Sequence, residues 1–307
     1  MFNKTKSSLA LLAAITFSGS ASAAIITQWE YSTLLTFTGA GFDSGTGQQI
    51  VNDSELSWGQ TVASGGHFTL DNETTDDGNR SALTIGNPTG DSPSLVGGGE
   101  ATGTVETVTT PISDFSELTL AQIGIGNTLT HWNNPISSSY ATLETGALLD
   151  TLTLNPVGEP GNTVDAPSIN FDFKFLETLN NPPNNGDCVS GTPEPCGDLW
   201  GFIGIQNTNL EFDFQGNTYY ASVLVLGQNP GDASPIAELD IDQCTALGFD
   251  EGCQGFITNE NAATTAKFGF AITVAPTSVP LPAAVWLFGS ALVGFAGFSR
   301  FRKSNKA

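Results

Sequence analysis

The sequence contains few basic residues. Lys and Arg number nine against 31 Asp and Glu, for a formal net charge of -22 and a pI near 4.1. Binding to the phosphate backbone depends on clustered Lys and Arg, so nucleic acid is excluded as a partner. Charged residues reach only 13%, against about 25% in typical soluble domains, which disfavours a cytosolic enzyme. A hydrophobic content of 39% is enough for a core and excludes wholesale disorder.

The long apolar runs lie at the two ends of the chain. Residues 1–23 carry Lys4 and Lys6, then an apolar run from Leu9 to Phe17, then small residues. This order is typical of a secretory signal peptide, and the apolar run is shorter than the roughly 20 residues of a spanning helix. We expect cleavage within the sequence Ala21-Ser22-Ala23-Ala24, after Ala23. The signal peptide is therefore left out of the expected fold.

Residues 281–298 form an uncharged stretch near the other end. As a helix this stretch would be about 27 Å long, close to the ~30 Å hydrocarbon core of a bilayer. Arg300, Arg302, Lys303 and Lys306 follow, and positive charge beside a spanning helix stays cytoplasmic. We expect the preceding chain to lie outside the inner membrane.

The motif Val279-Pro280-Leu281-Pro282 precedes this helix. Its two prolines favour an extended peptide just outside the bilayer. Motif, apolar helix and basic tail together resemble the PEP-CTERM sorting signal of Gram-negative bacteria, which is read by exosortase, a membrane-embedded cysteine transpeptidase or protease. That signal has Pro-Glu-Pro, whereas Leu281 stands between the prolines here. The resemblance implies processing at residues 279–307; a plain tail anchor is the alternative.

The chain between the two ends holds almost all of the acidity. Residues 24–280 contain Arg80, Lys174 and Lys267 against all 31 acidic residues, a formal net charge of -28. No cofactor is expected, although oxygen ligands suit Ca²⁺. Two acidic groups offer such ligands: Asp71, Glu73, Asp76 and Asp77 in one loop, and Asp240 and Asp242 on one face of an expected strand. A solvated acidic surface is the alternative for both.

Four cysteines lie in the second half of the chain. In an exported protein they favour two disulfides, and we expect the local pairs Cys188–Cys196 and Cys244–Cys253. Zinc is not expected, because the spacings are not CxxC and the two histidines are distant in sequence.

Apolar and polar residues alternate in the middle of the chain. Ile169–Phe175 and Leu210–Phe214 have period two, which is typical of half-buried strands. The other expected strands are Thr33–Phe37, Glu55–Trp58, Phe68–Leu70, Ala82–Ile85, Thr104–Thr109, Leu118–Ile123, Leu148–Leu154, Gly201–Ile205, Tyr219–Leu226 and Phe268–Val274. A helical turn or two is expected only in Pro235–Leu247. Residues 24–278 are thus predicted to form one all-β domain, a β-sandwich or jelly roll.

The most specific internal motif is Thr130-His131-Trp132-Asn133-Asn134, expected as a loop between two β-like stretches. It resembles the signature of the THxN family of PEP-CTERM proteins. Three further segments agree with that family's pattern: Leu56–Gly59, Phe173–Asn180 and Cys253–Glu260. The resemblance implies no established enzymatic activity.

Three roles are open for this motif. In the structural one, Asn133 and Asn134 adopt turn geometry before Pro135, while Thr130 and His131 bond loop backbone groups. In the second, His131 and Trp132 contact a glycan or partner loop. In the third, His131 is a catalytic base, but the chain has no GxSxG-type nucleophile turn. His67 is expected to begin a strand, and Glu177 has no partner carboxylate recognisable from the sequence.

These observations favour a non-enzymatic protein of the cell surface or extracellular matrix. We expect export by the Sec machinery, transient retention in the inner membrane, processing by exosortase and association with exopolysaccharide in a biofilm; the last two follow from the resemblance. One alternative is a lectin-like sandwich, with or without Ca²⁺, in which Trp29, Trp58, Trp132 or Trp200 stacks on sugar rings. A secreted hydrolase is the less favoured alternative.

Overall fold

The computed structural model describes residues 24–61, 80–86, 99–110, 115–159, 161–180, 188–189, 196–203, 209–227, 233–250 and 252–274. The signal peptide, the sorting signal, His67 and the acidic loop of residues 71–77 lie outside these ranges. Within the described ranges, no helix is long and apolar enough to cross a membrane.

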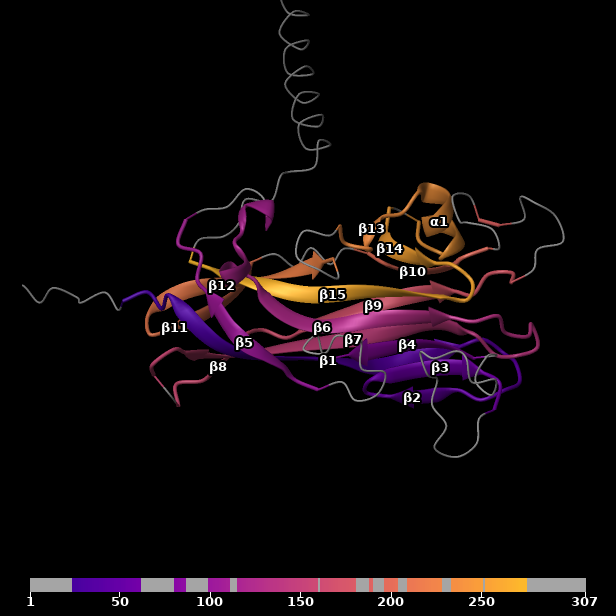
Figure 1. Ribbon diagram of the computed structural model, residues 1–307, viewed down its shortest axis with the longest axis horizontal. Coiled ribbons are helices and arrows are strands. Elements are labelled where there is room, and N and C mark those ends of the chain that lie inside the picture. Colours follow the sequence, from indigo (N-terminus) through magenta and orange to yellow (C-terminus); the bar gives the residue numbers. More distant parts are fainter. Residues whose placement is uncertain are drawn as a thin grey trace, which may run out of the picture.

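The described chain is all-β, as predicted, and forms two antiparallel sheets (Figure 1). The first sheet has, in spatial order, β13 (Ala237–Glu238), β14 (Gln254–Thr258), β10 (Asp198–Phe202), β9 (Ile169–Leu176), β7 (Leu143–Pro156), β1 (Gln28–Phe42) and β5 (Ala101–Glu106), with β8 (Val164–Asp165) paired to β7. The second has β11 (Leu210–Phe214), β12 (Asn217–Leu226), β15 (Ala262–Thr273), β6 (Gly124–Asn133), β4 (Arg80–Gly86), β3 (Glu55–Gly59) and β2 (Ile50–Asn52). The described helices are short: η1 (Phe115–Glu117), η2 (Leu120–Gln122) and α1 (Ile241–Ala246).

The hydrophobic core combines side chains from both sheets. In its main cluster, Phe173 and Phe175 of β9 and Trp200 of β10 meet Trp58 of β3 and Leu129 of β6. The alternation that predicted β9 thus has its expected cause, since Ile169, Phe173 and Phe175 are buried while Asn170 and Asp172 are exposed. A second cluster lies around Trp29, Tyr219 and Phe270.

Three sequence predictions on secondary structure are wrong. The segment Leu118–Ile123 contains the short helix η2 rather than a strand. Asp240 and Asp242 do not share a strand face: Asp240 caps α1, its side chain accepting from the Gln243 N–H at 2.8 Å, and Asp242 lies in the first turn. The third is the motif at residues 130–134, described below. The expected helical turn within Pro235–Leu247 is confirmed as α1.

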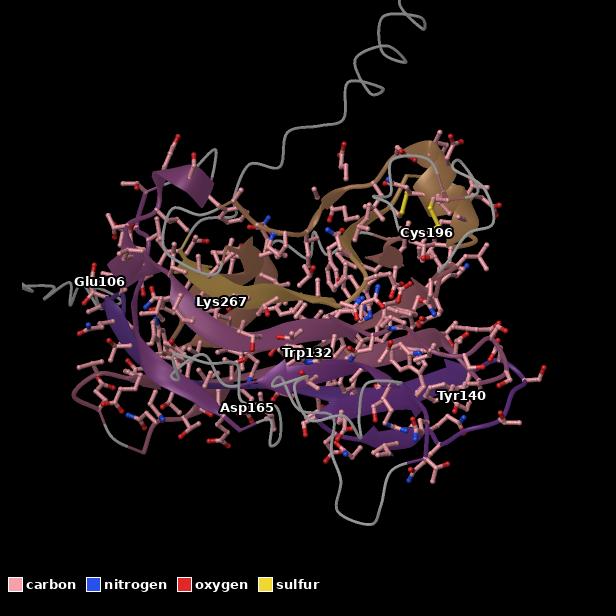
Figure 2. All side chains as sticks on the ribbon, turned by 45° about the vertical axis from the view of Figure 1, so that its right-hand side comes forward. Glu106, Trp132, Tyr140, Asp165, Cys196 and Lys267 are labelled. Atoms are coloured by element: carbon pink, nitrogen blue, oxygen red, sulfur yellow. A yellow bond between two sulfur atoms is a disulfide. The ribbon has the colours of Figure 1, made fainter. Side chains whose placement is uncertain are left out.

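Both predicted disulfide pairs are present. Sulfur–sulfur distances are 2.07 Å in Cys188–Cys196 and 2.09 Å in Cys244–Cys253. Figure 2 shows both bonds in yellow beside α1. Cys244 and Cys253 pack with Leu199 and Leu247 in a small apolar cluster over β10. The Cys244–Cys253 bridge therefore fixes α1 against the first sheet.

We predict that the double variant Cys244→Ala/Cys253→Ala unfolds at lower denaturant concentration. A bridge spanning nine residues constrains the unfolded chain by about 2–3 kcal/mol in the chain-entropy model, and two buried sulfurs are lost as well. Urea titration of oxidised protein measures the difference. Reduced wild type, which loses Cys188–Cys196 as well, should be no more stable than the oxidised variant. Equal stability of the oxidised variant and oxidised wild type would contradict the prediction.

Candidate functional site: a buried polar cluster between the sheets

The sequence motif lies in a strand and not in the expected loop. Thr130, His131, Trp132 and Asn133 are the last four residues of β6, which pairs with β4 on one side and β15 on the other. His131 lies opposite Leu83 and Thr264 in the two ladders. The turn interpretation failed because β6 is a central strand, whose backbone groups are used by its neighbours.

Asn133 and Asn134 connect strands through their side chains. The Asn133 amide donates to the backbone oxygen of Thr258 at 2.9 Å, and so links β6 of the second sheet to β14 of the first. The Asn134 amide donates to the backbone oxygen of Arg80 at 2.8 Å. Both asparagines are almost fully buried. Both asparagines thus have structural roles, but they bond the carbonyls of other segments, and the predicted turn geometry is wrong.

Thr130 and Trp132 serve the second sheet itself. The Thr130 hydroxyl lies 2.9 Å from the Thr265 hydroxyl, and the Trp132 indole N–H donates to the Thr84 hydroxyl at 2.9 Å. Figure 2 shows Trp132 among the central strands. Trp132 is therefore a core residue.

His131 points into the space between the sheets. Its ring lies 4.9 Å from the edge-on ring of Phe175 and 6.4 Å from the stacked indole of Trp58. The side chain is fully buried, and burial lowers the pKa of the imidazole to about 3. Neither ring nitrogen has a hydrogen-bond partner, although Nε2 lies 3.8 Å from Asp198 Oδ2. The imidazole is therefore neutral at physiological pH.

Asp198 begins β10 and is fully buried. Its Oδ1 accepts from the Thr178 N–H at 2.8 Å, whereas Oδ2 faces His131. Leu199 of β10 pairs with Leu176 of β9, so the antiparallel register carries Asp198 to the level of Glu177. On the other side Asp198 pairs with Thr258 of β14. Asp198 is thus central to the cluster.

Glu177 follows β9 directly. Its Oε2 accepts from the Trp58 indole N–H at 3.1 Å, while Oε1 is buried without a donor. Burial, followed by the charge of Asp198, raises the pKa of Glu177 well above its usual range. Burial, followed by the charge of Glu260, also raises the pKa of Asp198. Two acceptor-only carboxylates in contact are unfavourable, so the pair is best satisfied by a proton held between Glu177 and Asp198.

Glu260 completes the group from the connection between β14 and β15. Its Oε1 lies 3.4 Å from the donating Asn133 amide, and Oε2 has no partner. The residue is 9% exposed, and burial raises the pKa of its carboxyl to about 7. We call His131, Glu177, Asp198 and Glu260 the carboxyl cluster. Its immediate polar neighbours are Asn133 and Thr258, whose Oδ1 and Oγ1 atoms are buried and unpartnered.

All four sequence segments that resemble the THxN pattern meet at this cluster. Trp58, His131, Glu177 and Glu260 represent one segment each, and they come from both sheets. The partner carboxylate for Glu177 that the sequence did not reveal is Asp198, which belongs to none of the four segments. In the sequence, Asp198 is marked only by its place at the start of a strand. The sequence therefore gives no indication that it lies beside Glu177.

The chemistry open to this cluster is proton binding. Among the residues that the structure describes, no group of three or more His, Cys, Asp or Glu side chains is arranged to hold a metal ion. His131 and Asp198 are fully buried, so neither faces a surface that a substrate could reach. The catalytic interpretation of His131 gains no support from this geometry.

The tryptophans expected to stack on sugars are core residues. Trp29, Trp58 and Trp200 have no exposed surface and Trp132 is 4% exposed. Trp29 makes edge-to-face contacts with Phe214 and Tyr219, and Trp200 stacks on Phe256. The four indoles therefore offer no platform for a glycan, contrary to the lectin-like alternative.

A separate small cavity lies between the sheets near Asp150. Its volume is about 20 Å³, enough for roughly one water molecule. The Thr33 hydroxyl donates to Asp150 Oδ1 at 2.8 Å, and burial raises the pKa of Asp150 to about 6. The remaining lining is mainly apolar, including Leu152, Ile169 and Phe270. This is too small for an organic ligand.

We predict that Asn133→Ala lowers the free energy of unfolding by about 1–3 kcal/mol, because it leaves the buried Thr258 carbonyl without its donor. Asn162→Ala is the matched control, since Asn162 is exposed and its side-chain amide donates to Glu159 at 3.2 Å; it should change stability by less than about 0.5 kcal/mol. Urea unfolding measures both. Equal effects would show that Asn133 does not connect the sheets.

A second prediction concerns packing around the imidazole. His131→Ala should destabilise by about 2–4 kcal/mol, because it leaves a cavity against Trp58 and Phe175. His131→Phe, which fills the site without polar atoms, should retain more stability than the alanine variant. Thermal melts rank the three proteins. An alanine variant as stable as wild type would exclude a structural role for His131.

No family model matches the chain, and no curated protein matches it either.

Proposed function

We propose that this chain is an exported, non-enzymatic protein of the cell surface or extracellular matrix of a Gram-negative bacterium. A signal peptide ending at Ala23 directs it to the Sec machinery. The C-terminal helix then holds it in the inner membrane until exosortase acts at Val279–Pro282. The mature body is a jelly-roll-like β-sandwich that associates with exopolysaccharide in the biofilm.

The observation that carries this proposal is the orientation of the motif. The polar side chains of His131 and Asn133 turn into the interior between the sheets and not toward a surface. A motif buried in this way stabilises the folded body. The remaining specific signals of the sequence are then the two at its ends, and both concern export and sorting. Function then depends on where the body is delivered.

The cysteines and the charge support an extracellular address. All four cysteines form disulfides, which persist in oxidising compartments outside the cytosol. A net charge of -28 on residues 24–280 keeps such a body dispersed and favours cationic partners or counterions. The structure offers no comparable support for the lectin-like or the hydrolase alternative. The four indoles that a lectin would use are buried, and so is His131, which a hydrolase would use as its base.

The intact mass of the protein from the native host's surface and medium tests the proposal. We expect the mature chain to begin at Ala24 and to end near Pro280–Pro282 in the wild-type host, and to extend to Ala307 in a strain without exosortase. Pro280→Ala/Pro282→Ala should accumulate uncut chain, because the extended peptide outside the bilayer is lost.

Pro276→Ala is the matched control, since Pro276 lies just upstream of the motif. It should be processed as wild type is. A chain that ends at Ala307 in both strains would make the protein a tail-anchored envelope protein and would remove the link to exopolysaccharide.

A further inference from the structure

The carboxyl cluster joins the two sheets at one place. His131 and Asn133 come from β6 and Trp58 from β3 of the second sheet. Asp198 begins β10 of the first sheet, and Glu177 directly follows the neighbouring strand β9 at the same end. Two hydrogen bonds cross between the sheets here: Trp58 to Glu177 at 3.1 Å, and Asn133 to Thr258 at 2.9 Å. Any change in the carboxyls therefore acts on the contact between sheets.

The cluster contains three acids and no cation. On the surrounding strands, the contacts described for the Arg80 and Lys174 side chains are with groups outside the cluster. The Arg80 guanidinium of β4 donates to the Ser57 hydroxyl, which in turn donates to Glu55 of β3. Lys174 of β9 donates to the backbone oxygen of Gly248 and lies over the Phe249 ring, and Lys267 of β15 lies opposite Thr128.

Three ionised carboxylates buried together without a cation would repel one another in a poorly solvated site. Protons remove that repulsion. They also give Glu177 and Asp198 the donor that each buried oxygen lacks, since a protonated carboxyl donates to its neighbour. The geometry is thus consistent with protonated acids.

We propose that the carboxyl cluster is a proton-dependent latch between the two sheets, closed when its acids hold protons and loosened when they release them to solvent. This inference goes beyond the proposed function and does not depend on it. It means that the folded body takes up protons and is most stable in mildly acidic medium.

The sign follows from the direction of each pKa shift. The pKa of Glu260 is raised from 4.5 to about 7, so its stabilising protonation is fully present below pH 4.5 and is lost as pH rises through about 7. Glu177 and Asp198 act in the same direction. His131 acts oppositely, because folding lowers its pKa from 6.5 to about 3. Below pH 6.5 the histidine is protonated in the unfolded chain but neutral in the folded one, so its contribution to stability falls as pH falls. The proton on Glu260 and the proton shared by Glu177 and Asp198 outweigh the one histidine, and Asp150 outside the cluster acts in the same direction as the acids. Stability therefore declines as pH rises above about 4.5.

The test is urea unfolding of the mature chain between pH 4.5 and 8.5, in about 0.5 M NaCl to screen the surface acids. We expect the wild-type midpoint to fall as pH rises. Glu260→Gln keeps an acceptor for Asn133 and cannot ionise. The folding equilibrium constant should fall from pH 4.5 to pH 8.5 in both proteins, but by a factor that is about 10-fold to 100-fold smaller in Glu260→Gln than in wild type.

Glu211→Gln is the matched control. Glu211 is an exposed acid of β11, so its variant removes the same charge from the surface and should keep the wild-type pH profile. A wild-type midpoint that does not fall between pH 4.5 and 8.5, or equal profiles for the two variants and wild type, would overturn the latch.

Two further measurements test the latch, the first on wild type alone. The Thr178 N–H donates to Asp198 Oδ1. In wild type, its protection against hydrogen exchange should decrease between pH 5 and 8, after correction for the intrinsic exchange rate. Unchanged protection would contradict the latch. Addition of Ca²⁺ at pH 8 should stabilise wild type and Glu260→Gln equally. Stabilisation of wild type alone would assign the cluster to a cation and overturn proton binding.

Discussion

The burial of three carboxyl groups beside an uncharged imidazole is the constraint around which this end of the molecule is arranged. An isolated ionised carboxylate in an apolar interior is so unfavourable that it neutralises instead. Asp198 is held by two bonds from Thr178, which fix Oδ1 and leave Oδ2 facing His131. Phe175 and Trp58 exclude water from the ring of His131. The same aromatic packing that keeps the histidine neutral therefore keeps the acids protonated.

Strand register assembles this group from distant parts of the chain. Asp198 stands at the start of β10, between Thr258 of β14 and the level of Glu177 after β9. The chain then turns from β14 in the first sheet to β15 in the second, and Glu260 lies in that connection, within reach of Asn133. A one-residue slip of β10 would turn Asp198 to the opposite face of the sheet. The cluster thus depends on pairing across the whole first sheet.

The sequence predicted those features whose cause is local. Alternation in residues 169–175 identified β9, because one face of that strand is buried and the other is exposed. The disulfides were predictable because each joins cysteines eight or nine residues apart. Strand β6 escaped recognition since nine of its ten residues are buried, so that no polar face marks it. Asp240 carries no strand signal of its own and caps α1 instead. The pairing of Glu177 with Asp198 has a tertiary cause, and no local pattern predicts it.

The acidity of the body and the protonation of the cluster support each other. The excess of acids over bases in residues 24–280 gives the body a negative potential, which attracts protons and disfavours further ionisation of any acid within its reach. This field opposes release of the proton from Glu260, which is 9% exposed. Salt screens the surface charges within about a Debye length but acts little on the contacts inside the cluster. The surface acids therefore account for the part of the proton affinity that depends on ionic strength. Desolvation around His131 and Asp198 accounts for the part that does not, and it is the reason that the acids bind protons near neutral pH.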